Sequence, residues 1–376
     1  MLQRFKQMLI KEFIQILRDK RMKAVIFVIP VIQLFIFAHA ATLDLKVVMT
    51  AVYDQDNSSS SRELTKRLEK SGYFVISHYL KNEKEGQHFI DAGRVDVWLT
   101  FPPDFENKIL QGNSAQLGII LDGNNSNTAA IILNYIQKII LQYSQELFEK
   151  RWQEKNAGRA MPGRIDLRSR MWFNENLESL NFYVPGILSI LVTLITLMLT
   201  GMAVVREKEI GTMEQIMVTP ISSSEFILGK TIPFAIIGMI DVSLVIFVAV
   251  NLLGVPMRGS YLLLYLCFAI YIMTTLGMGL FISTISGTQQ QAMMTTFFFF
   301  FPAMLLSGFM FPIPNMPEVV QWLTLFNPLR YLLVIVRGIF LKGVGFEVLL
   351  PQILPLFCIG ILTLSLSVTR FKKNLA

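Results

Sequence analysis

The sequence is short of charge. Only 16% of its 376 residues are Asp, Glu, Lys or Arg, and 53% are hydrophobic. Soluble domains carry about 25% charged residues, so this shortage excludes an ordinary water-soluble domain for most of the chain. The 34 basic residues outnumber the 27 acidic ones. Whether that surplus indicates nucleic acid depends on where the charges lie.

Cysteine and histidine are also scarce. Cys267 and Cys358 lie far apart in apolar runs, and His39, His78 and His88 show no metal-ligand spacing. The sequence therefore contains no disulfide framework, metal motif or catalytic constellation. A G-x-x-x-x-G-K-[ST] loop is absent as well, so the chain cannot cradle nucleotide phosphates in the usual way. We expect this chain to bind no cofactor.

Long apolar runs stand in place of the missing charge. A membrane core of about 30 Å needs roughly 20 apolar residues in a helix. Six runs meet that length and predict six transmembrane helices: Ala24–Thr42, Phe182–Val205, Thr231–Leu253, Tyr261–Ile285, Ala292–Phe311 and Val348–Thr369. Ala38-His39-Ala40 resembles a signal-peptidase site, but the run before it is long enough to span, so we expect a retained anchor.

A seventh apolar run, Val319–Phe340, is interrupted by polar residues. It contains Asn327, Pro328, Arg330 and Arg337, and charge is costly within a membrane span. It is therefore predicted to form a re-entrant or surface helix pair within an outer segment, 312–342. Snorkelling or structural pairing is the expected role of the two arginines.

The segment 44–181 is polar and nearly charge-balanced, with 17 basic and 18 acidic residues. It is long enough to be a domain. Predicted strands alternate with predicted helices, the strands at 46–53, 73–78, 95–101 and 116–121 and the helices at 62–70, 102–110 and 128–149. This alternation favours an α/β unit with a mostly parallel sheet.

These features together predict the fold class. It is an α-helical polytopic membrane protein, with six transmembrane helices and a small α/β domain inserted between the first and second. The predicted parts are an N-terminal helix (1–23), the first span (24–43), the insert (44–181) and spans two to six (182–376).

The placement of basic residues predicts the orientation. Residues 1–23 carry seven basic and two acidic residues, and the tail carries Arg370, Lys372 and Lys373. Positive flanks stay in the cytoplasm. Both termini are therefore expected in the cytoplasm, with the insert outside as an extracytoplasmic domain. Because topology accounts for the basic surplus, we expect no nucleic-acid partner.

The first 23 residues are patterned as an amphipathic helix. Leu2, Phe5, Leu9, Phe13 and Ile16 recur at three- and four-residue spacing, with basic residues off that stripe. Such a helix lies in the membrane interface, its basic side chains near anionic headgroups, or packs on the protein's own cytosolic surface. The two placements are compatible.

The segment 206–220 follows the second predicted span and reads R-E-K-E-I-G-T-M-E-Q-I-M-V-T-P. It carries both charge signs, a Gly-Thr break and a Thr-Pro stop. Ile210, Met213, Ile216 and Met217 can share one helix face. This pattern indicates docking onto another cytosolic surface, and a solvated loop bound to lipid headgroups is the alternative.

Three motifs resemble those of one family. The run at 206–220 resembles the R-E-K-E-x-G-T-x-E-Q-x-x-x-T-P signature of the ABC-2 transporter permeases. The outer segment adds L-F-N-P-L-R-Y (325–331) and R-G (337–338), and the insert adds P-P-D-F (102–105) and L-D-G-N-N-S-N (121–127). The similarity covers essentially the whole chain and is greatest to the subgroup with a large extracytoplasmic insert after the first span.

The resemblance implies a permease subunit of an ATP-binding cassette exporter in a bacterial inner membrane, without an ATPase site of its own. Two permease chains, identical or paralogous, would pair. Each would dock a cytosolic ATPase subunit that uses ATP and Mg. ATPase coupling falls by resemblance on Arg206, Glu207, Glu209, Gly211, Thr212, Glu214, Thr219 and Pro220, with the N-terminal helix as a further contact.

The resemblance leaves the cargo open. We expect a drug-like, lipidic or amphiphilic compound, or an ion. The insert is expected to offer an outer gate or a docking surface for a periplasmic adaptor.

Asp241 is an acidic residue near the middle of the third apolar run. A charge at that depth costs at least about 2.5–3.5 kcal/mol, so the carboxyl must face protein or water, or be protonated. One interpretation places it on the translocation path, as a cargo contact or proton site. The other is a structural hydrogen bond to a neighbouring helix, for example to Thr or Gln near 288–296.

Two rival functions follow from these features. A proton-coupled secondary transporter would use Asp241 as its carrier. A membrane-anchored sensor would bind its ligand on the outer domain, but it needs only one or two spans and leaves four unexplained.

Overall fold

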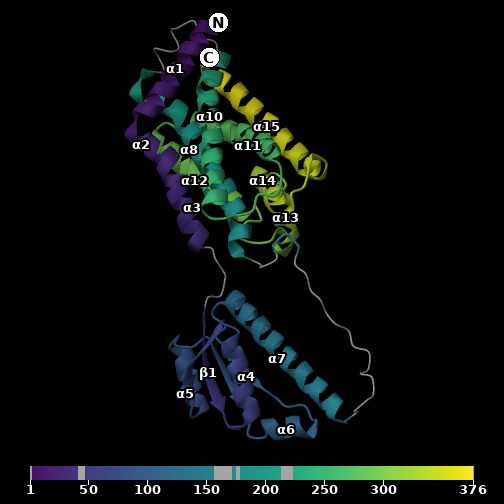
Figure 1. Ribbon diagram of the computed structural model, residues 1–376. Coiled ribbons are helices and arrows are strands. Elements are labelled where there is room, and N and C mark those ends of the chain that lie inside the picture. The colour runs from purple at the N-terminus through teal and green to yellow at the C-terminus, as the bar shows by residue number, and fades with distance from the viewer. Residues whose placement is uncertain (1, 41–46, 156–171, 175–177, 213–222, 376) are drawn as a thin grey trace. The chain divides into compact units, whose positions relative to one another are not determined.

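The computed structural model describes residues 2–40, 47–155, 172–174, 178–212 and 223–375 (Figure 1). The chain divides into two compact units. Residues 1–42 and 170–376 form one, called here the helical unit, and residues 43–169 form the other, the α/β unit. Of the predicted coupling residues, Glu214, Thr219 and Pro220 lie outside the described residues.

The α/β unit is built on a four-stranded sheet. Its strands are β1 (Val48–Asp54), β2 (Phe74–Tyr79), β3 (Val97–Phe101) and β4 (Gly118–Leu121), in the order β2-β1-β3-β4. β1 is parallel to both neighbours, whereas β4 is antiparallel to β3. The four strands lie where the alternating pattern predicted them, and the sheet is mostly parallel.

Helices cover both faces of this sheet. On one face, α4 (Ser59–Lys70) and α7 (Ser126–Lys155) contribute Leu64, Leu68, Ile132 and Ile136 to the larger core, and α6 (Phe105–Gln111) adds Phe105. On the other face lies α5 (Glu83–Asp91), which the sequence pattern did not predict. Gly86 allows this short helix to approach the sheet, because a Cβ there would lie 2.6 Å from the Trp98 ring.

The helical unit begins with α1 (Leu2–Arg18), α2 (Lys20–Lys23), a π-helical turn (Ala24–Val28) and α3 (Ile29–Ala40). After the α/β unit come α8 (Ser179–Ile210), α10 (Ser223–Asn251), α11 (Tyr261–Ile285) and α12 (Gln289–Leu305). The last elements are a 3₁₀ turn (Ile313–Asn315), α13 (Glu318–Thr324), α14 (Pro328–Arg337), a π-helical turn (Gly338–Lys342) and α15 (Phe346–Leu375). α8 is the central helix, with contacts to α3, α10, α11, α12 and α14.

Four of the described helices are long and apolar enough to cross a membrane. They are Ser179–Ile210, Glu225–Asn251, Tyr261–Ile285 and Phe346–Thr369. The pair Glu318–Thr324 and Pro328–Lys342 passes the same test together but is bent by 80°, the geometry of a broken span or a re-entrant segment. Four of the six predicted spans therefore correspond to long apolar helices.

The other two predicted spans correspond to shorter helices. The first is a shorter apolar helix, Ala24–His39, that begins with the π-helical turn. The fifth, predicted over Ala292–Phe311, is only the 17-residue α12. α12 stops early because the chain turns: the Ser307 hydroxyl donates to the Met304 carbonyl, and Gly308 has φ of 83°, in the left-handed region that suits glycine.

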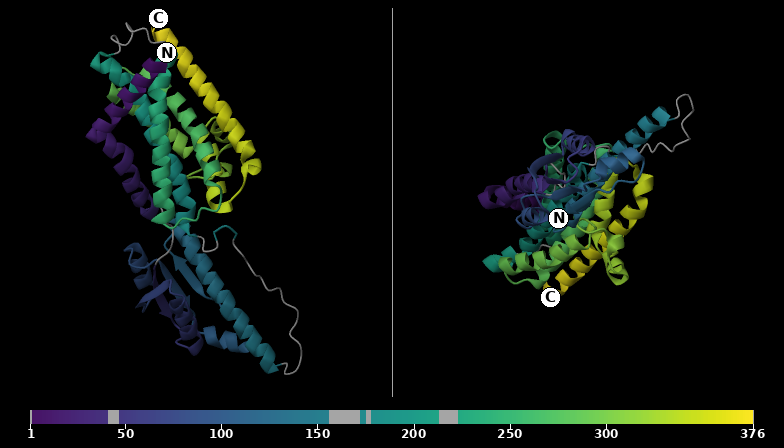
Figure 2. Two further views of the ribbon diagram at one scale, coloured as in Figure 1. Left: turned by 45° about the horizontal axis from the view of Figure 1, so that its top comes forward. Right: turned by 90° about the horizontal axis from the view of Figure 1, so that it is seen from below.

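The helix ends of this unit gather at two levels. At one level, Met8 of α1 packs with Val204, Phe226, Leu280 and Val368, which lie near the end of α8, the start of α10, the end of α11 and the end of α15. At the other level, the side-chain amide of Asn327 donates to the Ala303 carbonyl, and the backbone N–H of Arg258 donates to the Phe340 carbonyl. The start of α1 and the end of α15 accordingly lie at the same end of the unit (Figure 2).

Candidate functional site

The last turn of α8 carries a buried glutamate, Glu207, with only 4% of its surface exposed. α8 ends at Ile210, and Gly211 adopts a φ of 80° to close it, a conformation that glycine reaches without strain. The Thr212 hydroxyl donates back to the Glu207 carboxylate. The start of the predicted coupling segment is thus folded onto the helix that precedes it.

Lys230 of α10 points its ammonium group at the same carboxylate. Its Nζ lies 2.8 Å from Oε1 of Glu207 and 2.7 Å from Oε1 of Glu12, which belongs to α1. Lys11 of α1, about half exposed, adds a third contact at 3.1 Å from Glu207. We call Lys11, Glu12, Glu207 and Lys230 the ionic cluster. It joins three helices.

Because the cluster is buried, breaking one of its ion pairs would cost considerable stability. Glu12 and Lys230 are each 2% exposed, and removing one partner of a buried ion pair costs about 3–5 kcal/mol, because the other charge is left uncompensated. The two lysines and two glutamates balance in charge. The cluster therefore holds α1, the end of α8 and the start of α10 in one arrangement.

Close packing supports the cluster. Gly229 lies beside α1, and a Cβ at that position would come within 2.6 Å of the Met8 sulfur. A larger residue at position 229 would have to displace the Met8 side chain of α1.

The other predicted coupling residues lie around the cluster. Arg206 pairs with Asp19 at 3.7 Å, and both are partly exposed. Glu209 is exposed and accepts a 2.6 Å hydrogen bond from the Gln289 amide at the start of α12. The structure thus brings the described residues of the motif together, and it adds Glu12 and Lys230, which the sequence motif did not indicate.

α1 has more apolar surface than its sequence stripe predicted. Ile16 of that stripe is buried in the helical unit, but Ile10, Ile14 and Leu17 form a second apolar row that is 40–57% exposed. Ile10 and Ile14 of that row line a groove of about 660 Å³ together with Lys11 and Arg18. α1 therefore packs on its own bundle with one face and leaves another apolar face uncovered.

Asp241 is completely buried in α10, with 0% of its surface exposed. Neither carboxyl oxygen has a hydrogen-bond partner within the described residues. The interpretation of Asp241 as a structural hydrogen-bond acceptor therefore finds no partner among these residues, and Thr296 donates to the Ala292 carbonyl of its own helix. The free energy needed to bury a carboxyl group without partners is far smaller for the neutral acid than for the anion.

Three residues of the outer motif, Asn327, Pro328 and Arg330, lie at the connection between α13 and α14. The Asn327 side chain caps α14 by accepting from the Leu329 amide at 3.1 Å, and Pro328 takes the first helical position, where its missing N–H costs nothing. Arg330 donates to the Thr324 hydroxyl.

Arg337 differs from Arg330. No acidic partner pairs with its guanidinium in the part of the chain that the structure describes, and Nε and Nη2 are buried without acceptors. Its guanidinium carbon instead lies 3.9 Å from the centre of the Phe182 ring, a cation–π contact. Snorkelling or structural pairing therefore stays a prediction for Arg337.

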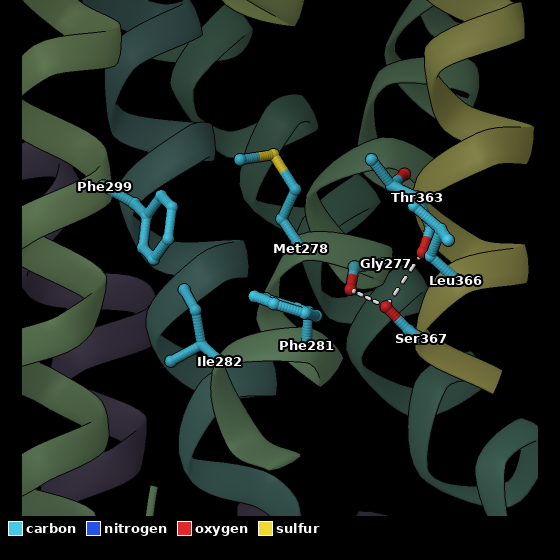
Figure 3. Close-up of a pocket in the computed structure, with 8 residues that line it drawn as sticks. All are labelled: Gly277, Met278, Phe281, Ile282, Phe299, Thr363, Leu366 and Ser367. Atoms are coloured by element: carbon cyan, nitrogen blue, oxygen red, sulfur yellow. Dashed lines mark hydrogen bonds between the residues drawn. The ribbon is translucent and has the colours of Figure 1, made fainter. Parts of the chain in front are cut away.

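An apolar pocket of about 190 Å³ lies between α11, α12 and α15, and Figure 3 shows the residues that line it. Phe281, Phe299 and Leu366 line it, and the Ser367 hydroxyl donates to the Gly277 carbonyl at 2.6 Å. That hydroxyl is satisfied internally, so the pocket offers almost no polar contact to a ligand. Among the described residues, no group of three His, Cys, Asp or Glu side chains could hold a metal ion.

Comparison with known proteins identifies the class. The model of a family described as ABC-2 family transporter protein matches residues 21–369. The chain is 34% identical over 364 residues to the probable multidrug ABC transporter permease YbhR of Escherichia coli K12, covering 97% of each chain. It is 32% identical over 374 residues to the probable multidrug ABC transporter permease YbhS of that strain, covering 99% of this chain and 97% of the relative.

The inner membrane transport permease YhhJ, also of Escherichia coli K12, is 28% identical over 370 residues, with 97% of this chain and 96% of the relative covered. The chain therefore belongs to the ABC-2 transporter family, as its three motifs predicted. Its apolar helices make it a multi-pass membrane protein, and its relatives are named permeases of ABC transporters.

Proposed function

We propose that this chain is the permease subunit of an ATP-driven exporter, and that the ionic cluster couples its helices to a separate ATPase. Glu207 carries the proposal. It stands in the last turn of α8, just before the segment 211–220, and it contacts α1 and α10 directly. A force applied to that segment by a docked ATPase would reach three helices through one carboxylate.

The topology that suits this function has six crossings, α3, α8, α10, α11, α12 and α15. The alternation of helix ends between two levels supports it, because the ends of α8, α11 and α15 share a level with the start of α10. The basic residues of α1 favour the cytoplasm for that level. The α13–α14 pair and the α/β unit then lie outside.

The ATPase, with ATP and Mg, belongs to a partner subunit. The missing G-x-x-x-x-G-K-[ST] loop supports this division of labour. The uncovered apolar row of α1 offers that partner, or the membrane surface, a place to bind. A second permease chain, identical or paralogous, completes the path for an amphiphilic or drug-like cargo or an ion. The relatives named multidrug permeases support this cargo class.

The test compares two glutamates that differ in burial. Glu207→Gln keeps the shape of the side chain and removes its charge, whereas Glu83→Gln changes an exposed residue of the α/β unit. In proteoliposomes containing permease and ATPase, we expect Glu207→Gln to reduce cargo export per ATP hydrolysed at least tenfold and Glu83→Gln to change nothing. Equal export by both variants would overturn the coupling role.

The α/β unit is proposed to act as an outer gate or as a surface for an envelope adaptor. A groove of about 700 Å³ between α4 and α7, lined by Arg67, Tyr143 and Glu146, supports the second role. Deletion of residues 44–181 as a block is expected to stop export. Normal export after that deletion would remove this part of the proposal.

Asp241 favours a second candidate function, proton-coupled transport. A buried acid without a partner can take up or release a proton during a transport cycle. This candidate predicts uptake into vesicles that is driven by a pH gradient without any ATPase and is abolished by Asp241→Asn. Transport that requires ATP and the ATPase and survives Asp241→Asn would exclude it.

A further inference from the structure

A partly open cavity of about 350 Å³ lies beside the ionic cluster and is lined by residues of α1, α2, α8, α10 and the start of α12. Its size falls within the range of about 300–1,000 Å³ that is usual for small-ligand sites. One part of its wall is apolar and includes Ile16, Met22, Leu199 and Phe234. Another part is charged. A cavity with both kinds of wall fits an amphiphilic ligand.

The charged wall contains equal numbers of both signs. Arg206 and Lys230 are positive, and Asp19 and Glu12 are negative. Lys230 and Glu12 are almost completely buried and only 2.7 Å apart. Arg206 and Asp19 are 3.7 Å apart, with 28% and 31% of their side chains exposed. The exposed pair is therefore the one that a ligand can reach.

The spacing of Arg206 and Asp19 leaves room for additional contacts. A tight charge-assisted pair measures about 2.7–2.9 Å between nitrogen and oxygen, so the contact between Arg206 and Asp19 is longer than that, and Oδ1 of Asp19 also accepts a hydrogen bond from the Met22 amide at 3.3 Å. The planar guanidinium presents several donors in a fork that matches phosphate oxygens, and the carboxylate accepts hydrogen bonds from an ammonium. One ligand group that carries a phosphate and an ammonium would meet both.

The position of the cavity along the helices points to a lipid. Arg206 lies about one turn before the end of α8, and Lys230 lies near the start of the apolar helix Glu225–Asn251. Charged residues at the ends of apolar helices lie at the level of the lipid headgroups. The apolar wall, from Leu199 to Phe234, then continues toward the hydrocarbon.

We propose that this cavity binds the phosphoethanolamine headgroup of a membrane phospholipid. Its phosphate contacts Arg206, its ammonium contacts Asp19, and the start of an acyl chain lies along the apolar wall. The bound lipid fills the space between α1 and the helix bundle. This site is separate from the apolar pocket between α11, α12 and α15, which offers no charged contact.

The experiment measures lipid binding to the purified, full-length permease without any ATPase, by native mass spectrometry after titration with phosphatidylethanolamine. Arg206→Gln and Asp19→Asn each remove one headgroup contact. Ala203→Phe fills the cavity and leaves every charge in place, since Ala203 lines the wall and is 7% exposed. Lys342→Gln, at the other level of the helical unit, is the matched control.

We expect one phosphatidylethanolamine per chain, bound at least tenfold more tightly than phosphatidylglycerol, because the latter has no ammonium. Arg206→Gln, Asp19→Asn and Ala203→Phe should each weaken binding about tenfold or more, since a charge-assisted hydrogen bond is commonly worth a tenfold change or more. Lys342→Gln should bind as the unchanged chain does.

Other outcomes would overturn the proposal. Equal binding of phosphatidylglycerol would show a general anion site without a role for Asp19. Equal binding by Ala203→Phe would place the lipid elsewhere. If that variant fails to fold, unchanged binding by Arg206→Gln and Asp19→Asn would likewise place the lipid outside this cavity. Binding of soluble glycerophosphoethanolamine as tight as that of the lipid would rule out a role for the apolar wall.

The outcome is independent of the coupling proposal. The titration contains no ATPase, so a permease that fails to bind the lipid would still be compatible with the proposed coupling role of Glu207.

Discussion

Lys230 and Asp241 are two buried charged residues on one helix, about three turns apart. Lys230 is 2% exposed and has a carboxylate at 2.7 Å and another at 2.8 Å. Asp241 is 0% exposed, and within the described residues its oxygens have no hydrogen-bond partner. The first charge is compensated and fixes the positions of three helices. The second is uncompensated and is cheapest to bury as the neutral acid.

This difference separates two uses of a buried charge. A compensated charge holds a structure together, because breaking it strands its partners. An acid without partners does not link helices, so its replacement by a neutral residue should lower the stability of the protein only slightly. Any effect of that replacement on transport would then reveal a role in function. Substitutions at the two positions test each half of that contrast.

The largest effect is expected from Lys230→Met, which leaves the two buried carboxylates of Glu12 and Glu207 with only the half-exposed Lys11 as a cation. We expect a loss of about 3–5 kcal/mol in the free energy of unfolding. Heating in detergent can be followed by labelling the buried thiol of Cys267, with the exposed Cys358 replaced by serine.

The matched variant removes the whole cluster. Lys230→Met combined with Glu12→Gln and Glu207→Gln leaves no stranded buried charge, so most of the lost stability should return. A triple variant as unstable as Lys230→Met alone would contradict compensation by these carboxylates.

A smaller effect is expected where helices touch closely without charge. A Cβ on Gly277 of α11 would lie 2.8 Å from the backbone nitrogen of Leu364 on α15. Gly277→Ala should therefore cost about 1–3 kcal/mol through overpacking, seen as a lower midpoint in the same thiol assay. Gly345→Ala has open space around its Cβ and should leave the midpoint unchanged. Equal midpoints for the two variants would argue against this close approach.

Asp241→Asn should change stability by less than about 1 kcal/mol, because asparagine has the shape of the neutral acid and a single isosteric change away from strained features is usually small. Thermal unfolding at neutral pH measures this. A loss comparable to that of Lys230→Met would mean that Asp241 is a compensated anion after all.

The smallest effect is expected in the α/β unit. Hydrogen bonds from the hydroxyls of Ser59 and Ser60 lower the pKa of Glu106 below its usual value of 4.5. The folded-state pKa is thus the lower one, so this contribution to stability is present above pH 4.5 and is lost as the pH falls through the folded pKa.

Hydrogen exchange of the α4 segment 59–70, corrected for intrinsic rates, should therefore rise on acidification, and less so in Glu106→Gln. An identical rise in both proteins would show that Glu106 is not responsible.

The sequence was most informative where periodicity is strong. Strands such as 95–101 and the long apolar helices from Tyr261 and Val348 were predicted close to their positions, because pattern and length decide them locally. The short helix α5 was missed because Gly86 weakens its helical pattern. The glycine is needed there for close packing against the Trp98 ring, which only the folded structure shows. The end of α12 was misplaced because a turn at Ser307 and Gly308 interrupts an apolar run.

The site was predictable only in part. The motif at 206–220 identified Glu207, but its partners Lys11 and Lys230 lie 196 and 23 positions away in sequence, on α1 and α10, and only the fold brings them together. Lys230 did leave a signal, as a lone lysine at the start of an apolar run. Its two carboxylate partners could not be deduced from spacing.

A double-mutant cycle between Glu207→Gln and Lys230→Met tests the central claim most directly, with thermal stability and export per ATP measured on the same four proteins. If these side chains form one coupling unit, the double variant should lose much less than the sum of the two single losses in both measurements, with an interaction free energy above about 1 kcal/mol in stability. Losses that add to within about 0.5 kcal/mol, with independent effects on export, would contradict it.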